Sequence, residues 1–212
     1  MGHSPQPARL EPTTVVAEAV RMLDEHGLAA VTLRAVADRL GVRMNTVLWH
    51  VKSKARLREL MADALIGEID FDDLPEPWES RVHEMLHRLR RVLLSHRDGA
   101  AVVTGTYALE PHTLRFAEEL TTTLLHGGLG AKETSWAVWT TLYVTLGLVQ
   151  EEQAPAGPRP ATLRHAITEQ HYPALHSILG DFTETDFEAR FDFAITAQLT
   201  ALRARIHQQP AS

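Results

Sequence analysis

Apolar residues recur along most of this 212-residue chain at the three- and four-residue spacing of amphipathic helices. No segment has the sustained apolar/polar alternation of a strand, and no Asn-Gly hairpin turn occurs. The pattern therefore predicts an all-α protein of about ten helices. The expected helices span residues 13–26, 33–40, 44–50, 53–69, 78–95, 97–103, 111–126, 131–153, 162–179 and 185–207.

Two segments interrupt this helical pattern. Residues 70–77 (Asp-Phe-Asp-Asp-Leu-Pro-Glu-Pro) follow the first four helices, and we interpret them as a domain boundary. Residues 153–160 (Gln-Ala-Pro-Ala-Gly-Pro-Arg-Pro) are interpreted as a flexible connection before the last two helices. The pattern thus divides the chain into a small N-terminal unit and a larger C-terminal unit.

Composition narrows the class of protein. A hydrophobic content of 44% and a charged content of 23% are ordinary for a globular protein. The absence of cysteine excludes a disulfide framework, a cysteine zinc site and a thiol nucleophile. The polar start is unlike a signal peptide, and no apolar run approaches the ~20 residues needed to cross a bilayer. We therefore expect a cytoplasmic protein without a membrane partner.

Residues 33–52 meet the geometric demands of a helix-turn-helix. Two helices that cross steeply need a small residue at their contact, which Ala37 supplies. The tight turn needs a residue that tolerates positive φ, and Gly41 stands four positions later. The side chains expected to lie buried between the two helices are Val36, Leu40, Val42 and Val47.

The same pattern also fits a helical hairpin that only packs, and the local charge favours the DNA-binding interpretation. Residues 34–58 hold seven basic side chains and one acidic one, although the whole chain has a net charge of −6. Polar residues begin the second helix: Arg43 can pair with guanine and Asn45 with adenine, beside Thr46. Lys52 and Lys54 can hold phosphates.

Three segments resemble proteins of the tetracycline-repressor (TetR) family. Residues 32–54 resemble the family's DNA-binding signature, including Trp-His-Val-Lys at 49–52. Residues 93–100 (Leu-Leu-Ser-His-Arg-Asp-Gly-Ala) and 151–153 (Glu-Glu-Gln) resemble segments of its ligand-binding domain. The resemblance implies a helix-turn-helix domain over 1–54, a connecting helix over 55–70, and a ligand-binding and dimerisation domain over 71–212.

The resemblance also implies which residues contact DNA. One position departs from the pattern: Leu48 stands where the family usually has a tyrosine that touches DNA, so we expect a different operator sequence. The expected DNA-binding residues are Thr32, Arg34, Arg43, Met44, Asn45, Thr46, Leu48, Trp49, His50, Lys52 and Lys54.

The expected ligand differs from that of the tetracycline-binding members. Val103 replaces the histidine that binds the drug's magnesium, while Thr106 and Glu151 remain. Mg²⁺ would keep one carboxylate and little else, so we expect a larger or more apolar inducer and no metal or cofactor. The candidate ligand-binding residues are Met85, Leu89, Val103, Thr106, Tyr107, Glu119, Trp136, Trp139, Tyr143 and Glu151.

Two of these expectations leave alternatives open. Trp136, Trp139 and Tyr143 share one helix face, which fits a core or dimer interface as well as a ligand pocket. The last helix carries a wide apolar stripe that can pack on its own domain and on a second copy. Its members are Phe187, Phe191, Ala194, Ile195, Gln198, Leu199 and Leu202.

The twelve histidines invite a metal interpretation, which the sequence alone does not favour. His83 and His87 stand four residues apart, a spacing that can chelate zinc. No third ligand is evident near them in the sequence, so a solvated helix face is the preferred interpretation. No nucleophile, phosphate loop or paired-carboxylate motif stands out, and we expect no enzymatic activity.

The leading hypothesis is therefore a ligand-responsive transcriptional regulator. It would be a repressor that binds palindromic double-stranded operator DNA as a homodimer and is released by a small-molecule inducer. The alternative is a helical small-molecule-binding or enzymatic domain whose N-terminal hairpin mediates protein contacts only. An activator in place of a repressor is a third possibility.

Overall fold

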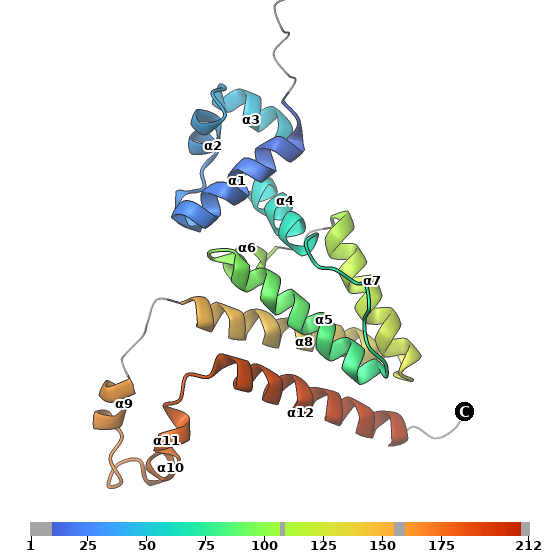
Figure 1. Ribbon diagram of the computed structural model, residues 1–212, viewed down its shortest axis with the longest axis vertical. Helices are drawn as coiled ribbons and strands as arrows, with labels where there is room; N and C mark the ends of the chain where they lie inside the picture. Colours follow the sequence, from blue (N-terminus) through green and yellow to red (C-terminus); the bar gives the residue numbers. More distant parts are fainter. Residues whose placement is uncertain (1–9, 107–108, 155–159, 209–212) are drawn as a thin grey trace, which may run out of the picture.

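The protein is described by a computed structural model over residues 10–106, 109–154 and 160–208 (Figure 1). Within these residues the chain forms twelve α-helices and one short 3₁₀ helix, and no strand. The expected all-α fold is confirmed. No helix of these three ranges combines the length and the apolar character needed to cross a bilayer.

The N-terminal helices form a small unit around their own core. Proline begins α1, and Thr32 caps α2 by accepting a hydrogen bond from the Ala35 N–H at 3.1 Å. Val15, Leu23 and Val36 are fully buried at the centre of this core. The unit consists of α1 (Pro12–His26), η1 (Leu28–Ala30), α2 (Leu33–Arg39) and α3 (Met44–Val51).

Helix α4 (Lys54–Ile66) leads from this unit into the rest of the molecule (Figure 1). Its side chains Leu57, Met61 and Leu65 are buried in the N-terminal core. Ile66, at its last position, is buried in the core of the larger unit. One continuous helix therefore contributes to both cores.

The larger unit packs long helices around a second apolar core. Leu86, Leu120, Phe191 and Ile195 are among its fully buried side chains. In Figure 1, α5, α8 and α12 lie stacked, with α6 at one end of α5. The helices of this core are α5 (Trp78–Ser95), α6 (Gly99–Val103), α7 (Pro111–His126), α8 (Ala131–Gln153) and α12 (Phe187–Gln208).

The expected single helix over residues 162–179 is wrong. The structure has three short helices between α8 and α12: α9 (Pro160–Ala166), α10 (Pro173–Ser177) and α11 (Leu179–Phe182). Proline lacks a backbone N–H and cannot continue a helix, so Pro173 begins a new one. The apolar periodicity of this stretch concealed the break.

Helix α6 begins at Gly99, two residues later than expected. The residue before the helix, Asp98, has a left-handed backbone conformation (φ 56°), so the chain changes direction there and the helix starts after it. Gly99 is required by close packing, because a Cβ atom there would overlap the carbonyl oxygen of Leu93 at the end of α5. The short helix is thereby held directly against α5.

Candidate DNA-binding and ligand-binding sites

Helices α2 and α3 form the steep hairpin expected from the sequence. Gly41 in the turn has φ 65°, and the Val42 N–H donates to the Ala37 carbonyl oxygen at 3.0 Å. Ala37 and Val47 are buried where the helices meet. The small residue, the glycine and the buried valine therefore take the positions that the sequence pattern requires of them.

The outer face of α3 presents polar and aromatic side chains to solvent. Arg43 occupies the position just before the helix, and it lies exposed beside Met44 and Asn45. The Trp49 side chain is 62% exposed, although an apolar ring of that size usually buries itself. Exposure of arginine, asparagine and tryptophan on one short helix gives a surface that can contact base edges.

Five of the other expected DNA-binding residues are half-buried or form hydrogen bonds within the protein. Thr46, Leu48 and His50 are half-buried beneath the exposed face of α3. Lys52 closes the helix by donating from Nζ to the Trp49 carbonyl oxygen at 2.6 Å, and its ammonium lies 5.3 Å from that indole ring. The hydroxyl of Thr32 is occupied as the α2 cap.

Three of the seven basic side chains between residues 34 and 58 bond to groups on other helices of the same chain. Arg39 pairs with Glu18 and Glu25 on α1, and it holds the pKa of Glu25 below its usual value through a hydrogen bond. Arg56 pairs with Glu110 of α7, and Arg58 donates to backbone carbonyls at the end of α6. Besides Arg39, which is paired, the exposed basic side chains of this region are Arg34, Arg43, Lys52 and Lys54.

The larger unit contains an apolar cavity of about 340 Å³ between α4, α5, α6, α7 and α8. Five expected ligand residues line it. Two threonines contribute polar atoms: Thr106 donates to the Val103 carbonyl oxygen at 2.6 Å, and Thr113 donates to Asp63. No charged side chain lines this cavity among the described residues. The five expected residues are Leu89, Val103, Thr106, Trp139 and Tyr143.

The other expected ligand residues lie elsewhere. Met85 is fully buried in the helical core, and Glu119 is 3.8 Å from Arg81 in an ion pair. Trp136 lies in a separate groove between α8 and α12, so the three residues of the expected stripe do not share one site. Glu151 is exposed, and it does not line the cavity. Tyr107 lies outside the described residues.

Sequence reasoning missed much of the cavity wall. On α8, Val138, Leu142 and Leu146 recur every four residues beside Trp139, and this periodicity was a usable signal. The walls from α4 and α7 carried no comparable signal, because their apolar residues look like ordinary core positions. The missed residues are Ile66, Gly105, Leu109, Thr113, Leu114, Phe116, Ala117, Val138, Leu142 and Leu146.

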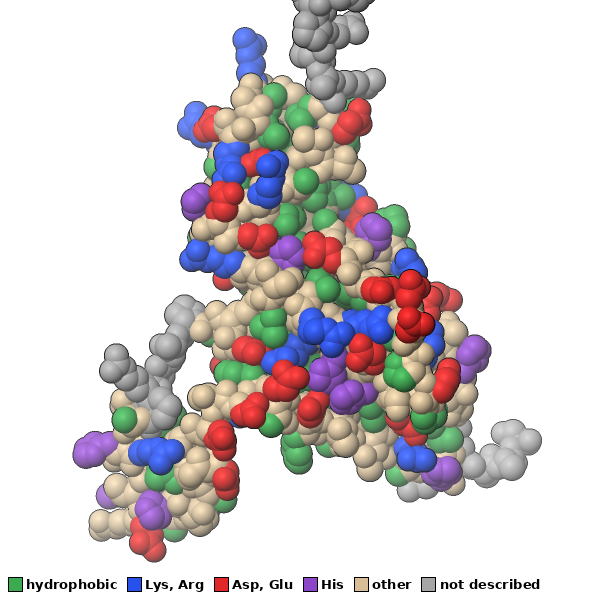
Figure 2. Space-filling model, in the orientation of Figure 1, with side chains coloured by type: hydrophobic (Ala, Val, Ile, Leu, Met, Phe, Trp, Pro, Cys, Tyr) green, Lys and Arg blue, Asp and Glu red, His purple; other side chains and the backbone are tan. Residues whose placement is uncertain are grey.

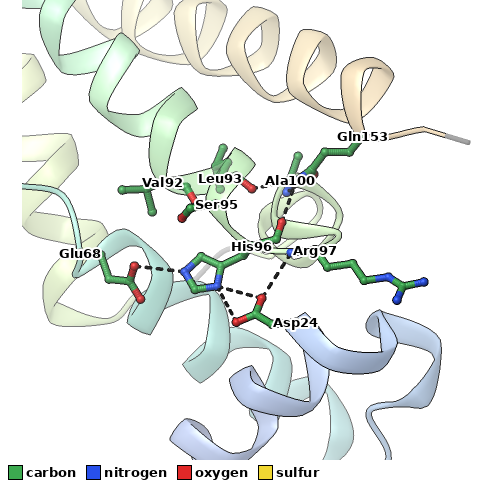
Figure 3. Close-up of polar contacts among 9 residues, drawn as sticks. All are labelled: Asp24, Glu68, Val92, Leu93, Ser95, His96, Arg97, Ala100 and Gln153. Carbon is green, nitrogen blue, oxygen red and sulfur yellow. Dashed lines mark hydrogen bonds and ion pairs between the residues drawn. The ribbon is translucent and has the colours of Figure 1, made fainter.

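A polar cluster joins the two units at the start of α6 (Figure 3). His96 lies between two carboxylates: its Nδ1 is 3.0 Å from Asp24 on α1, and its Nε2 is 3.1 Å from Glu68 beyond α4. Burial lowers the pKa of His96, but hydrogen bonds to Glu68 and Asp24 outweigh burial and leave the pKa raised. The side chain of Asp98 accepts a hydrogen bond from the Leu28 N–H at 2.8 Å.

Gln153, at the end of α8, holds the other side of this cluster (Figure 3). Its side-chain nitrogen donates to the carbonyl oxygens of Leu93 and His96, each at 2.8 Å. Its side-chain oxygen accepts from the Ala100 N–H at 3.1 Å. The turn between α5 and α6 is therefore held by hydrogen bonds to residues of the N-terminal unit and to Gln153 of the larger unit.

Two family models match the two units of the chain. The model described as bacterial regulatory proteins, tetR family, matches residues 15–61, and the tetracyclin repressor-like C-terminal domain matches residues 72–206. The second match alone covers more than half of the chain. The chain belongs to the tetR family.

Individual relatives agree with this membership. The tetracycline repressor protein class A of transposon 1721 from Escherichia coli is 30% identical over 93% of this chain and 92% of its own. A possible TetR family transcriptional regulator from Streptomyces coelicolor is 35% identical, with a TM-score of 0.82 over 92% of this chain and 99% of its own. ActR from the same organism, solved with actinorhodin, is 25% identical, with a TM-score of 0.85 over 93% and 97%.

Membership in the tetR family decides between the two classes of function considered from the sequence. The matched N-terminal model is one of bacterial regulatory proteins, and it covers the α2–α3 hairpin. The hairpin is thus the DNA-binding helix-turn-helix of a transcriptional regulator, and not a hairpin that only packs. The matched model and the curated relatives are regulatory proteins and repressors.

Proposed function

We propose that this tetR-family protein is a homodimeric repressor that binds palindromic operator DNA and is released by a neutral, largely apolar aromatic molecule. The observation that carries the proposal is the position of α6. This helix contributes Val103 to the apolar cavity and Val102 to the core beneath the helix-turn-helix. A molecule in the cavity therefore contacts an element on which the DNA-binding unit is packed.

The exposed face of α3 provides the contact with DNA. Arg43 offers a planar fork of donors that matches guanine, and Asn45 matches adenine, when α3 enters the major groove. Trp49 and Leu48 supply apolar contacts of the kind made to a thymine methyl group. Arg34 and Lys54, exposed on either side of α3 in the sequence, suit contacts to phosphates. These chemistries account for sequence selection and for attachment to the backbone.

The chemistry of the cavity determines the class of ligand. A volume of about 340 Å³ is within the range of small-molecule sites, and the aromatic rings of Trp139 and Tyr143 can stack on a planar ligand. Hydroxyl groups at Thr106 and Tyr143 can bond to carbonyl or hydroxyl groups. A tetracycline–magnesium complex fits poorly, because the described part of the wall lacks a histidine or carboxylate to bind the metal. ActR, which is similar to this chain, has been solved with actinorhodin.

Dimerisation is supported by the outer face of α8 and α12. The apolar stripe expected on α12 is split, since Phe191, Ile195 and Leu199 are buried in their own core. Phe193 remains 78% exposed on the opposite side. A groove of about 260 Å³ between α8 and α12 contains Trp136 and Gln198, and the Gln198 side-chain oxygen is buried without a hydrogen-bond donor in the described structure. A second copy would cover this apolar surface.

The proposal includes the division of the chain and its place of action. We assign residues 1–54 to DNA binding, residues 55–70 to the connecting helix, and residues 71–212 to ligand binding and dimerisation. Helix α4 belongs to both cores, which suits a connecting role. Operator DNA lies in the bacterial cytoplasm, and the protein acts there.

DNA binding and release are tested together by fluorescence anisotropy. The purified dimer is titrated onto labelled DNA from the promoter region beside its own gene, at several salt concentrations, with a scrambled duplex as control. We expect selective binding that weakens as salt rises. Addition of neutral polycyclic quinones should release the DNA, whereas tetracycline with Mg²⁺ should not. Equal binding to both duplexes, or release by tetracycline with Mg²⁺ alone, would contradict the proposal.

A further inference from the structure

Two histidines of α5 and one aspartate of α12 converge on one point at the surface of the larger unit. The Nε2 atom of His87 lies 2.7 Å from the Oδ1 atom of Asp192, and the Nε2 atom of His83 lies 3.4 Å from the same oxygen. One ligand atom from each of the three side chains lies within 4.8 Å of the others. Asp192 supplies the third ligand that the local sequence around His83 and His87 lacks.

The three side chains are held in place by the packing of the helices. His83 and His87 stand one helical turn apart, with ring centroids 4.4 Å apart. The His87 side chain is only 11% exposed, and its ring meets the face of buried Phe191 edge-on at 4.9 Å. His83 and Asp192 are 35% and 49% exposed, so the site opens to solvent on one side. Figure 2 shows histidine side chains gathered on this face, over α5 and α12.

The chemistry of these groups suits a transition-metal ion. Neutral imidazole is the ligating form of histidine, and two imidazole nitrogens here face one carboxylate oxygen. Two nitrogen donors and one carboxylate are a ligand set typical of zinc, whereas Mg²⁺ and Ca²⁺ prefer oxygen donors alone. Ligands of a tetrahedral zinc ion lie roughly 3.3 Å apart. The separation of His83 Nε2 and Asp192 Oδ1 is 3.4 Å, and small side-chain shifts bring the other pairs to this spacing.

We propose that His83, His87 and Asp192 form a zinc site that links α5 to α12. The three side chains fill three positions of a tetrahedral ion, and the fourth faces solvent. A groove of about 410 Å³ runs along α5 and α12 beside His83, and it gives an ion and a water molecule access. Zinc bound here holds the last helix against the core, and none of its three ligands lines the apolar cavity. The inference is independent of the DNA-binding proposal.

The site is tested with the full-length protein after removal of metal by a chelator. Zinc binding is measured by calorimetry and by competition with a chromogenic chelator, and the melting temperature is recorded with and without zinc. We expect one zinc ion per chain and a melting temperature that rises with zinc concentration by mass action. His83→Gln and His87→Gln should each weaken zinc binding by more than about tenfold and remove the thermal shift.

Two further variants separate ligand loss from damage to the fold. His126→Gln, on the exposed side of α7, should leave zinc binding unchanged. Asp192→His replaces the carboxylate with a third imidazole and should retain or strengthen zinc binding, and Co²⁺ bound to it should give visible absorption of a tetrahedral complex. The proposal is overturned if the wild-type protein binds no zinc at micromolar concentrations, or if His83→Gln and His87→Gln bind zinc as the wild-type protein does.

Discussion

Val102 and Val103 are neighbours in α6: both pack against the N-terminal core, and Val103 also packs against the larger core and lines its cavity. Val102 is fully buried in the core of the N-terminal unit, with residues of α1 and α4. Val103 lines the apolar cavity of the larger unit. Arg58 of α4 fixes this arrangement by donating to the Val102 carbonyl oxygen at 3.0 Å. A change of α6 conformation at the cavity therefore displaces a side chain from the core beneath the helix-turn-helix.

The first prediction concerns the stability contributed by this contact. Val102→Ala removes two buried methyl groups and leaves a void, and should lower the free energy of unfolding by about 2 kcal/mol. Val103→Ala is the matched control, because this side chain is only half-buried where it packs against the two cores and it borders an existing cavity. We expect a smaller effect from it in urea denaturation. Equal losses from the two variants would contradict the assignment of Val102 to the N-terminal core.

The second prediction concerns pH and His96. Its pKa is raised in the folded protein because hydrogen bonds to Glu68 and Asp24 outweigh the effect of burial. A raised histidine pKa gives stability that is complete below the unfolded value of about 6.5 and is lost as pH rises through the folded pKa. The free energy of unfolding should therefore fall above pH 6.5 in the wild-type protein, and His96→Gln should flatten that part of the curve.

An exposed histidine outside the cluster provides the control for His96→Gln. His126→Gln removes an exposed histidine of α7 and should keep the wild-type slope, measured by urea denaturation at intervals between pH 6 and pH 8. Glu25, whose pKa is lowered chiefly by its hydrogen bond to Arg39, affects the acid side of the profile in the opposite sense. A wild-type slope that survives in His96→Gln would show that the Asp24–His96–Glu68 cluster does not determine it.

The helix-turn-helix was predictable from local rules, whereas the cavity was predictable only in part. Ala37 and Gly41 are chosen by short-range geometry, and their spacing alone identified the hairpin. The cavity instead depends on how helices far apart in sequence meet. Ile66 and Ala117 both line the cavity wall, and neither has a local property that distinguishes it from core. Asp192 joins His83 and His87 for the same reason, across more than a hundred residues.

The third prediction concerns the reading of DNA by α3. Arg43→Ala should weaken operator binding by about 1–3 kcal/mol, or roughly 5- to 150-fold, and should relax selectivity at one base pair in each half-site. Lys54→Ala should weaken binding to all sequences alike and reduce the slope of log K against log salt by about 0.9. Anisotropy titrations with single-base operator variants distinguish these outcomes.

Arg91→Ala provides the control for charge. It removes an exposed arginine from α5, in the larger unit, and should change neither affinity nor selectivity for the operator. If Arg43→Ala weakens binding uniformly and leaves base selectivity intact, Arg43 contacts phosphate and not a base edge. That result would move direct sequence reading to Asn45 and the aromatic face of Trp49.

The fourth prediction concerns the α8–α12 surface. Ala201 is exposed and lies in the groove with Trp136 and Leu202, so Ala201→Glu places a charge in the proposed dimer interface without disturbing the core. We expect this variant to be monomeric by light scattering and to bind the palindromic operator weakly. Ala17→Glu makes the same substitution on exposed α1 and should remain dimeric. A dimeric Ala201→Glu protein would place the interface elsewhere.

The fifth prediction concerns occupancy of the cavity. Ala117 lines the wall from α7, and Ala117→Trp projects an indole into the space of about 340 Å³ that a ligand would fill. Nile red, a neutral aromatic dye, should bind the wild-type protein saturably with increased fluorescence, because an apolar pocket excludes water from it. The dye should not bind Ala117→Trp, which should still bind operator DNA because its helix-turn-helix is unchanged. Leu125→Trp, a partly exposed position of the same helix outside the cavity wall, should bind both dye and DNA. Dye binding that persists in Ala117→Trp would locate the ligand site outside this cavity, and loss of DNA binding in the same variant would indicate that filling the cavity is itself enough to shift α6.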